Sequence, residues 1–247
     1  SEVVGQKVNT RILESTLDDP YHTMIFQGSS GCGKTTSARI YGNMLKAHMI
    51  EVDAASNNSV DDIRRILELV RLAPLSNKYR VVIVDECHML TPNAWNAALK
   101  AIEEPNSSTI WIFCTTEFKK VPDTIKGRAV TFKFYPLGHD TIVNYLKEIL
   151  AKEGETLNDT VLTLIASNCK GQVRDALKMC QRCAYTGVET EDQFNKLFGI
   201  PDTAGMRAYI ESVLGGDVPL GLQVINKLTS NVDFFDWKCR LEGLIQD

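Results

Sequence analysis

Residues 28–36, with the sequence GSSGCGKTT, have the composition and spacing of a phosphate-binding turn. Glycines allow backbone N–H groups to converge on phosphate oxygens, and a following helix adds partial positive charge at its N-terminus. Lys34 would reach the β- and γ-phosphates of a nucleotide, and Thr35 would hold Mg²⁺ through its hydroxyl. The pattern occurs once, after a predicted strand and before a predicted helix, which is the setting it requires. The residues predicted to bind nucleotide here are Gly28, Ser30, Gly31, Cys32, Gly33, Lys34, Thr35 and Thr36.

A pair of acids follows the apolar run at residues 81–84. Asp85 and Glu86 would lie at the C-terminal edge of a parallel sheet, where open α/β folds bind ligands. Asp85 would join Thr35 in the Mg²⁺ shell, and Glu86 would polarise an attacking water. Together with the phosphate-binding turn, the acids predict a hydrolase rather than a protein that only binds nucleotide. His88 is interpreted as a structural neighbour of the acids and not as a catalyst.

Short apolar runs alternate with amphipathic segments in the first half of the chain. Most of these runs are continuously apolar, as expected for parallel strands covered on both faces. Strands are predicted at residues 24–28, 49–54, 81–86, 110–116 and 130–134. Helices are predicted from the cap residues Ser59 and Thr91 onward, the second with Pro92 at its first position. Strands that alternate with helices predict a doubly wound α/β fold.

The strand pattern ends after Pro136. Residues 139–154 carry apolar side chains at helical spacing, two more helices follow to about Tyr185, and a further helical stretch begins near Glu191. The last stretch ends at Asp247 without a stop signal, so we expect it to be incomplete. The predicted domains are an α/β domain at 1–136, a small helical domain at 137–188 and a further helical domain at 189–247.

The composition excludes several classes of protein. No run of about eighteen apolar residues occurs, so no membrane-spanning segment is predicted. The formal net charge is −4, so any contact with nucleic acid must come from a local basic surface. Seven cysteines, an odd number, predict free thiols in a cytoplasmic protein. Cys180 and Cys183, one helical turn apart, are interpreted as core residues, and no zinc site is expected.

Three further blocks carry a resemblance to a known family: IEVDAASNNSVDDIRRI at residues 50–66, VDECHMLTPNAWNAALKAIEEP at 84–105 and TTEFKKVPDTIKGRA at 115–129. With these blocks the chain resembles clamp-loader ATPases of the AAA+ class, and most closely the tau/gamma motor subunits of bacterial DNA polymerase III. The resemblance runs from Val3 to about Tyr185 and continues more weakly beyond. It implies an AAA+ P-loop ATPase domain with a five-stranded parallel sheet, then a helical lid and part of an all-α collar for oligomerisation.

The resemblance also implies roles for individual residues. Thr116, with Thr115 beside it, matches the first sensor of the γ-phosphate. Arg128 matches the arginine finger that acts on ATP held by a neighbouring subunit, and Arg174 matches the second sensor, which also contacts the nucleotide. Val3 and Val4, followed by Gly5 and Gln6, match the segment that lines the adenine pocket. The implied ligands are ATP and Mg²⁺, and the predicted catalytic residues are Lys34, Asp85, Glu86, Thr116, Arg128 and Arg174.

Three departures from the family pattern are visible. The finger motif is Gly127-Arg128-Ala129 where the family has Ser-Arg-Cys, and the glycine could loosen presentation of the arginine. The four-cysteine zinc module of the bacterial subunits is absent before the second strand. The chain is therefore either a shortened relative, from a phage or a divergent bacterium, or a sequence from which residues are missing. The basic-aromatic segment that precedes Val3 in the family is also absent, so part of the nucleotide pocket lies outside this sequence.

The leading hypothesis is a motor subunit that uses ATP to open a sliding clamp and load it onto primer–template DNA, with hydrolysis releasing both. Its partners would be other clamp-loader subunits in a pentamer, the clamp and the DNA. Arg64, Arg65 and Lys100 are the candidate DNA contacts, and residues 71–79 are the candidate clamp-facing stretch. Two alternatives remain open at this stage: another AAA+ DNA-remodelling motor, such as a hexameric branch-migration helicase, and a scaffold subunit that binds ATP without hydrolysing it.

Overall fold

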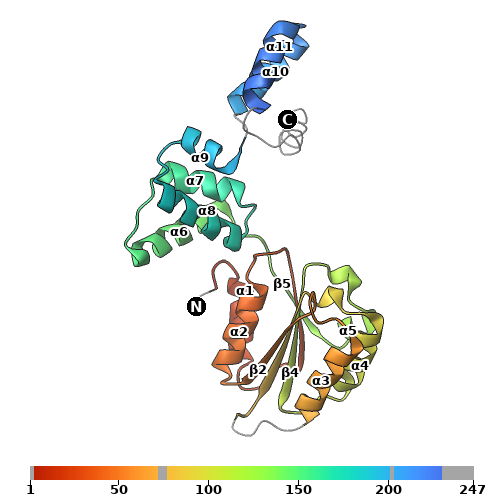
Figure 1. The fold of residues 1–247 in the computed structure, drawn as a ribbon. Coiled ribbons are helices and arrows are strands. Elements are labelled where there is room, and N and C mark those ends of the chain that lie inside the picture. Colours follow the sequence, from red (N-terminus) through yellow and green to blue (C-terminus); the bar gives the residue numbers. More distant parts are fainter. Residues whose placement is uncertain (1–2, 72–76, 201–202, 230–247) are drawn as a thin grey trace. The chain divides into compact units, whose positions relative to one another are not determined.

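A five-stranded, fully parallel sheet forms the centre of the first part of the chain (Figure 1). The computed structural model describes residues 3–71, 77–200 and 203–229. The strand order is β2-β3-β4-β1-β5, which confirms the predicted doubly wound α/β fold. The strands are β1 (Thr23–Gln27), β2 (His48–Asp53), β3 (Arg80–Asp85), β4 (Thr109–Thr115) and β5 (Val130–Lys133).

Four of these strands begin one residue before the apolar runs that predicted them. Thr23, His48, Arg80 and Thr109 are polar and were not counted in the runs, yet each pairs with a residue of a neighbouring strand or hydrogen-bonds to the chain beside it. Backbone hydrogen bonding, which does not depend on side-chain polarity, therefore extends the strands past their apolar centres.

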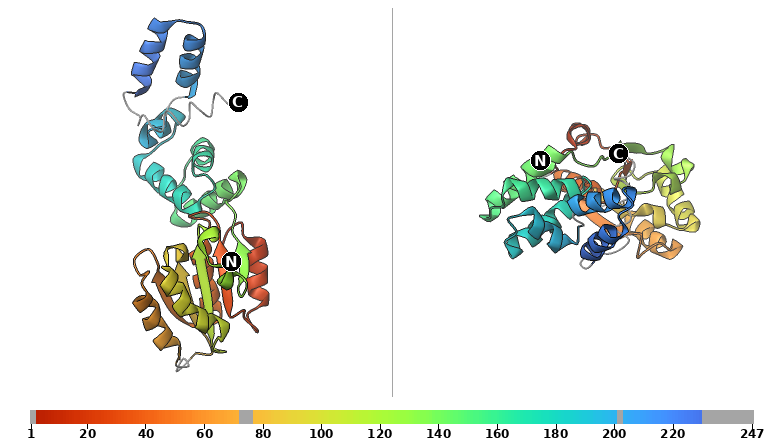
Figure 2. Two further views of the ribbon diagram at one scale, coloured as in Figure 1. Left: turned by 90° about the vertical axis from the view of Figure 1, so that its right-hand side faces the viewer. Right: turned by 90° about the horizontal axis from the view of Figure 1, so that it is seen from above.

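Helices cover both faces of the sheet (Figures 1 and 2). α1 (Lys7–Ser15) and α2 (Lys34–Met44) lie on one face. α3 (Val60–Arg71), α4 (Pro92–Glu103) and α5 (Asp123–Lys126) lie on the other. Two short 3₁₀ helices, η1 (Cys87–Met89) and η2 (Phe118–Lys120), follow β3 and β4. Only residues 45–47 separate α2 from β2, at the point where the zinc module of the resembled family would be inserted.

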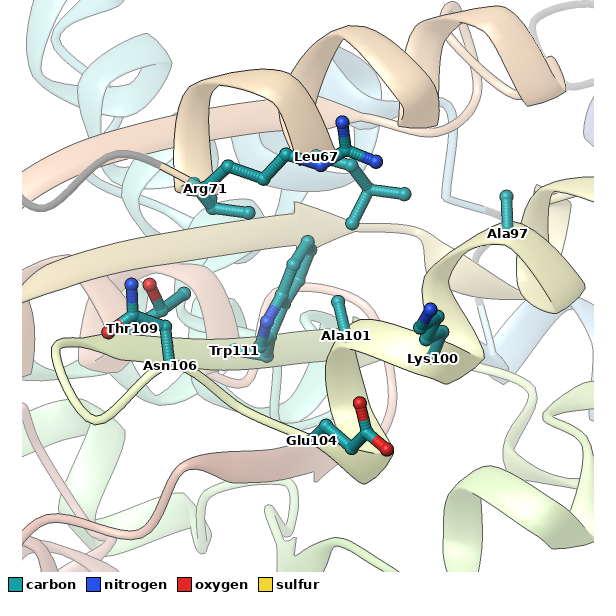
Figure 3. A pocket seen from close by; sticks show the side chains of 10 residues that line it. Leu67, Arg71, Ala97, Lys100, Ala101, Glu104, Asn106, Thr109 and Trp111 are labelled. Atoms are coloured by element: carbon teal, nitrogen blue, oxygen red, sulfur yellow. The ribbon is translucent and has the colours of Figure 1, made fainter.

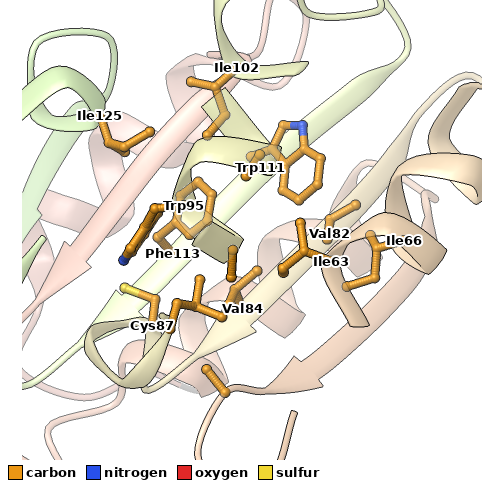
Figure 4. Close-up of a cluster of buried hydrophobic side chains, with 14 of the residues drawn as sticks. Ile63, Ile66, Val82, Val84, Cys87, Trp95, Ile102, Trp111, Phe113 and Ile125 are labelled. Atoms are coloured by element: carbon orange, nitrogen blue, oxygen red, sulfur yellow. The ribbon is translucent and has the colours of Figure 1, made fainter. Parts of the chain in front are cut away.

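Each face of the sheet has its own buried cluster, and Figure 4 shows the one beneath α3, α4 and α5. In that cluster the ring of Phe113 lies 5.9 Å from Trp111 and 5.2 Å from Trp95, measured between ring centroids. Ile63 and Ile66 of α3 pack against the same strands. Burial of a side chain of this size contributes about 1.5–3 kcal/mol to stability, so the cluster fixes α3 and α4 on the sheet.

The two predicted helix caps are confirmed. Ser59 Oγ accepts the Asp62 N–H at 3.2 Å, and the Asp62 carboxylate accepts the Ser59 N–H at 3.2 Å. Thr91 Oγ1 accepts the Ala94 N–H at 3.2 Å, and Pro92 occupies the first helical position of α4. Each side chain satisfies a backbone donor that the first helical turn leaves unpaired.

The described residues form two compact units: one holds residues up to 145 together with 169–176, and the other holds 146–168 and the helices from 177 onward. In the second unit α9 packs against α7 and buries Phe194, while α10 and α11 pack together. The predicted domain boundaries stay a prediction, and residues 230–247 of the third predicted domain lie outside the described residues. The helices are α6 (His139–Glu153), α7 (Asp159–Asn168), α8 (Val173–Thr186), α9 (Glu191–Phe198), α10 (Thr203–Leu214) and α11 (Val218–Thr229).

Cys180 and Cys183 lie in α8 and are buried, which confirms their interpretation as core residues. Burial raises the pKa of the Cys183 thiol to about 11. Such a thiol stays protonated and unreactive at neutral pH. None of the described helices is long and apolar enough to cross a bilayer.

Candidate nucleotide site

The predicted phosphate-binding turn joins β1 to α2, as the motif requires. A Cβ atom on Gly28 would lie 2.3 Å from the Phe134 carbonyl oxygen, so only glycine fits where the turn leaves the sheet. Gly33 is the N-cap of α2 with φ +97°, a conformation that residues with a side chain rarely adopt. These two glycines hold the open turn at the N-terminus of α2, where phosphate binding is favoured.

Lys34 is directed back into this turn. Its Nζ donates to the carbonyl oxygens of Gly28 and Ser29, both at 2.9 Å, and the residue is 6% exposed. The ammonium is thus held inside the turn by two neutral acceptors. Phosphate oxygens are stronger acceptors for a cation, because hydrogen bonds between charged partners are roughly twice as strong as neutral ones.

The turn meets the end of β3 through Thr35, whose Oγ1 donates to Asp85 Oδ2 at 2.8 Å. Both oxygens are ligands of the kind that Mg²⁺ prefers. The described residues contain no cluster of three His, Cys, Asp or Glu side chains that could hold a metal alone. A pair of oxygens beside a phosphate-binding turn fits Mg²⁺, which usually binds through one or two carboxylates together with substrate phosphates.

Glu86 follows directly and has an unusual backbone. Its φ is +46°, the left-handed region, where β3 ends and η1 begins. Residues other than glycine in this region are uncommon and concentrate at functional sites. Glu86 Oε2 accepts a hydrogen bond from Thr116 Oγ1 at 3.2 Å. The predicted base and the predicted first sensor are therefore in contact, although 30 residues separate them.

His88 lies beside this pair. Its Nδ1 is 3.3 Å from Glu86 Oε2, and its Nε2 is 3.3 Å from Glu117 Oε1. Glu117 also accepts from Lys120 Nζ at 2.9 Å, and this hydrogen bond is the main reason that the pKa of its carboxyl is lowered. Glu117 was missed by the sequence reasoning, although it directly follows Thr116 in the block that carries the resemblance.

Residues 172–174 at the start of α8 lie against the turn and belong to the same compact unit. The Val173 N–H donates to the Gly31 carbonyl oxygen at 3.1 Å. A Cβ atom on Gly31 would lie 3.4 Å from the Cβ of Arg174, the predicted second sensor. The amide of Gln172, in the orientation that satisfies both of its acceptors, donates to the Ser30 carbonyl oxygen at 3.2 Å. Sequence reasoning also missed Gln172, two residues before Arg174.

The N-terminal segment approaches the turn from a different part of the chain. A Cβ atom on Gly33 would lie 3.9 Å from Val3 Cγ1, and Val4 is half-buried beside Val3 in sequence. Gln6 Nε2 donates to Tyr135 O at 2.7 Å and to Cys32 O at 3.4 Å. The segment predicted to line the adenine pocket is therefore linked to the turn. Thr36, the last predicted residue of the turn, is exposed on the first turn of α2.

Cys32 is also part of this turn, and its Sγ donates to Ser29 O at 2.9 Å. Burial is the main cause that raises the pKa of its thiol. The side chain is 2% exposed, so it packs beneath the turn rather than acting as a nucleophile.

Arg128 is not brought to this site. Its NH2 group pairs with Glu103 Oε1 of α4 at 2.7 Å, and its NH1 group donates to Thr124 O of α5 at 2.8 Å. The guanidinium is partly exposed, with 43% of the side chain accessible. This position is compatible with a residue that acts on a neighbouring subunit, as the resemblance implies.

The candidate DNA contacts lie on α3 and α4. Arg64 pairs with Asp61 at 3.2 Å and Arg65 with Asp62 at 3.6 Å, so both arginines have acidic partners one turn away. Lys100 lies at a cavity of about 300 Å³ between α3 and α4, into which the Trp111 indole projects from β4 (Figure 3).

This cavity is at the opposite end of the strands from the phosphate-binding turn, since Thr109 at the start of β4 also lines it. Arg71, the first residue of the candidate clamp-facing stretch, lies at the same cavity. Residues 72–76 of that stretch lie outside the described residues. The DNA and clamp contacts stay predictions.

Comparison with known proteins identifies relatives. A family model described as DNA polymerase III, delta subunit, matches residues 29–138. The gamma/tau subunit of DNA polymerase III from Mycoplasma pneumoniae is 33% identical over 100% of the chain, and the tau subunit from Bacillus subtilis is 35% identical over 75% of it. The chain is a homologue of these gamma/tau subunits. The resemblance predicted from the sequence is thus confirmed.

This gamma/tau homologue spans only part of the length of the relatives described here. It covers 40% of the Mycoplasma protein and 38% of the Bacillus protein. It covers 70% of the gamma subunit from Buchnera aphidicola of Schizaphis graminum, to which it is 28% identical over 92% of its own length.

Solved structures with the same fold include the RuvB Holliday junction branch migration motor of Thermotoga maritima. The TM-score is 0.67 at 16% identity, over 85% of this chain and 76% of RuvB. A P216G variant of the same protein gives 0.67 at 17% identity, over 94% and 87%. At this identity the likeness shows the fold alone, which is the predicted α/β fold with a five-stranded parallel sheet followed by helices.

Proposed function

We propose that this gamma/tau homologue is an ATPase subunit of a clamp loader, which opens a sliding clamp and loads it onto primer–template DNA. The observation that carries the proposal is the pair of contacts that link Thr35 to Asp85 and Thr116 to Glu86. They join the phosphate-binding turn, the acid pair and the candidate sensor in one site. Homology to gamma/tau subunits supplies the biological setting.

Each residue of the site would have a separate role in phosphoryl transfer. Bound Mg²⁺–ATP would supply the electrophilic phosphorus and neutralise the developing charge. Lys34 would exchange its two carbonyl acceptors for phosphate oxygens, and Thr35 and Asp85 would hold the metal. Glu86 would orient the water and accept its proton at the carboxylate. For that, its Oε2 must exchange the Thr116 hydroxyl for the water.

Two arginines would complete the site. Arg174 would contact the nucleotide from the start of α8, consistent with the position of its Cβ beside Gly31. Arg128 would leave Glu103 and act on ATP bound by a neighbouring subunit. An arginine finger supplied in this way accelerates hydrolysis by about 10³–10⁵-fold, so turnover would depend on assembly. Hydrolysis would then time the release of clamp and DNA.

The proposed partners are other clamp-loader subunits in a pentamer, the sliding clamp and primer–template DNA. The likeness to RuvB does not favour a branch-migration helicase, because it is a likeness of fold at 16% identity, whereas the tau subunit from Bacillus subtilis is 35% identical. A non-hydrolysing scaffold is disfavoured because Lys34, Asp85 and Glu86 are all present.

The test is Mg²⁺-dependent ATP hydrolysis together with nucleotide binding. Lys34→Ala should weaken ATP binding by about 10- to 100-fold, since it removes charge-assisted hydrogen bonds of about 1.5–3 kcal/mol. Glu86→Gln should lower kcat by about 10²-fold or more and leave the Kd for ATP unchanged. Lys152→Ala, an exposed lysine of α6, is the matched control for Lys34→Ala. Unchanged turnover in Glu86→Gln would remove Glu86 from its role.

A further inference from the structure

We propose that His88 is a positioning residue for Glu86, held in place by Glu117. The inference rests on the proposed ATPase function. It assigns to Glu86, the candidate base, a second positioning residue besides Thr116. His88 Nδ1 lies 3.3 Å from Glu86 Oε2 and also hydrogen-bonds with Thr115 Oγ1 at 3.3 Å, while Thr116 Oγ1 donates to the same Glu86 Oε2 at 3.2 Å. The other ring nitrogen, Nε2, faces Glu117 Oε1 at 3.3 Å.

The ring is suited to hold a carboxylate because it is fixed on several sides. The His88 side chain is 9% exposed, against 34% for Glu86 and 49% for Glu117. η1 is closed by the Met89 N–H, which donates to Glu86 O at 2.9 Å, and Cys87 before His88 is fully buried in the core. A nearly buried ring on a short, anchored turn has little freedom to move away from Oε2.

The contacts continue outward as a line from the site to the surface. Lys120 Nζ donates to Glu117 Oε1 at 2.9 Å, and the Glu117 N–H donates to Thr115 Oγ1 at 3.0 Å, so Glu117 is fixed through both side chain and backbone. His88 therefore has a fixed partner on the side away from Glu86. This is the arrangement in which a third group orients the residue that holds a base.

Thr116 and His88, the two residues that contact Glu86 Oε2, differ in what they do during the reaction. As the proposed sensor, Thr116 must turn its hydroxyl to the nucleotide, and it then no longer holds Oε2. The contacts of His88 are with Glu86, Thr115 and Glu117, so a change in the Thr116 hydroxyl leaves its contact with Glu86 in place. His88 would keep the Glu86 carboxylate in its orientation while the carboxylate accepts the proton from water. The left-handed backbone of Glu86 already restricts the side chain, and His88 completes that restriction.

Substitutions can separate the two ring nitrogens. His88→Asn places an amide nitrogen close to the position of Nδ1 and keeps a donor for Glu86, whereas His88→Gln reaches the position of Nε2 and does not. We expect kcat to fall by about tenfold or more in His88→Gln and His88→Ala, with most of the rate restored in His88→Asn. The Kd for ATP should stay within about twofold of wild type in all three, because positioning acts on turnover and not on binding.

A double substitution tests whether His88 acts through Glu86. In a Glu86→Gln background, His88→Ala should cause no further loss in the single-turnover rate of ATP hydrolysis, since residues that act as a unit are not additive. Losses that add, or equal losses in Asn, Gln and Ala that follow a common fall in Tm, would overturn the proposal and leave His88 a packing residue. Unchanged kcat in His88→Gln and His88→Ala would overturn it as well.

Glu117→Gln provides a variant that leaves the buried ring in place. It should lower kcat several-fold without changing the Kd for ATP, with Glu153→Gln, an exposed acid of α6, as the control. If the His88 variants fail to fold, wild-type kcat in Glu117→Gln overturns the proposal by itself. Absence of hydrolysis by the wild-type chain, with clamp, primed DNA and partner subunits present, would instead contradict the proposed function. Normal wild-type turnover with unaffected variants contradicts only the role of His88.

Discussion

The Thr35 hydroxyl is the point where the phosphate-binding turn touches the end of β3. The hydroxyl donates a hydrogen bond to Asp85 in the nucleotide-free chain, and its oxygen can coordinate Mg²⁺ when the nucleotide is bound. This double use explains why a threonine suits the position, whereas the adjacent Thr36 is exposed and makes no such contact with the acid pair. Exchange of one partner for another requires little movement of the side chain.

Thr35→Val tests this account because valine has nearly the same shape and no hydroxyl. We expect a loss of about 1 kcal/mol in the free energy of unfolding, since Asp85 loses a donor, and a rise of tenfold or more in the Mg²⁺ concentration needed for half-maximal hydrolysis. A Mg²⁺ titration of the ATPase and a urea titration measure the two effects. Thr35→Ser keeps the hydroxyl and should resemble wild type. Equal Mg²⁺ requirements in both variants would contradict the role of Thr35.

The residues on the turn and the acid pair could be predicted from sequence because their spacing is local. Gly28 to Thr36 form one continuous motif, and Asp85 follows an apolar run that predicts a buried strand. His88 was interpreted as a neighbour of the acid pair, but the contacts that reach this group from β4 and from other elements could not be predicted in the same way. His88 and Glu117 approach each other only because β3 and β4 are neighbours in the sheet, and Arg128 meets Glu103 only because α5 is beside α4.

At the scale of elements, α4 links the acid pair at the end of β3 to the cavity between α3 and α4. Its N-cap, Thr91, lies two residues after the end of η1, and the helix carries Trp95 into the core and Lys100 to the cavity. Its N-terminus is held by the Thr91 cap and by Pro92. The start of α4 therefore sets where η1, and with it His88, can lie.

Thr91→Ala should lower the free energy of unfolding by about 1 kcal/mol, because the Ala94 N–H loses its acceptor. Urea unfolding followed by circular dichroism measures the loss. Thr91→Ser keeps the side-chain oxygen and should restore most of it. If alanine and serine have the same effect, then the cap does not stabilise α4.

A second element-scale contact joins α2 to β2. The Arg39 side chain forms two hydrogen bonds with Glu51, and this pairing is the main cause that lowers the pKa of the Glu51 carboxyl. A carboxyl with a lowered pKa in the folded state stabilises the fold above its ordinary pKa of about 4.3. The stabilisation is lost as the pH falls through the lower, folded value.

Glu51→Gln should therefore destabilise the chain at pH 7, and the difference should disappear at an acidic pH below the lowered pKa of Glu51 in the folded state. The difference at pH 7 should be below about 1 kcal/mol, because both side chains are partly exposed and solvent screens the pair. Urea titrations of wild type and variant at the two pH values measure it. A difference that persists unchanged at low pH would show that packing, and not charge, is responsible.

At the scale of the whole molecule, the proposed site would be completed by a neighbouring subunit. Arg128 is paired with Glu103 and is not brought to the nucleotide site of its own chain. If Arg128 acts on ATP bound by the neighbouring subunit, then ATP turnover requires assembly, while ATP binding does not. The sequence could indicate this only through the resemblance, because no local pattern distinguishes an arginine finger from a surface arginine.

Arg128→Ala should therefore leave the Kd for ATP unchanged and lower the ATPase rate of the assembled complex by about 10³-fold at sites that face the altered subunit. Nucleotide binding and steady-state hydrolysis on reconstituted complexes measure the two quantities. Arg11→Ala, an exposed arginine of α1, is the matched control. An equal fall in hydrolysis by the isolated chain would place Arg128 in its own site and contradict the account.

The central claim is that ATP hydrolysis by this chain is tied to loading a clamp on DNA. Steady-state hydrolysis should be measured for the chain with its partner subunits, first alone and then with the cognate sliding clamp and primed DNA. The account predicts a low basal rate that rises at least tenfold when clamp and primed DNA are both present, because assembly around them positions the arginine finger. A rate indifferent to clamp and DNA would contradict it.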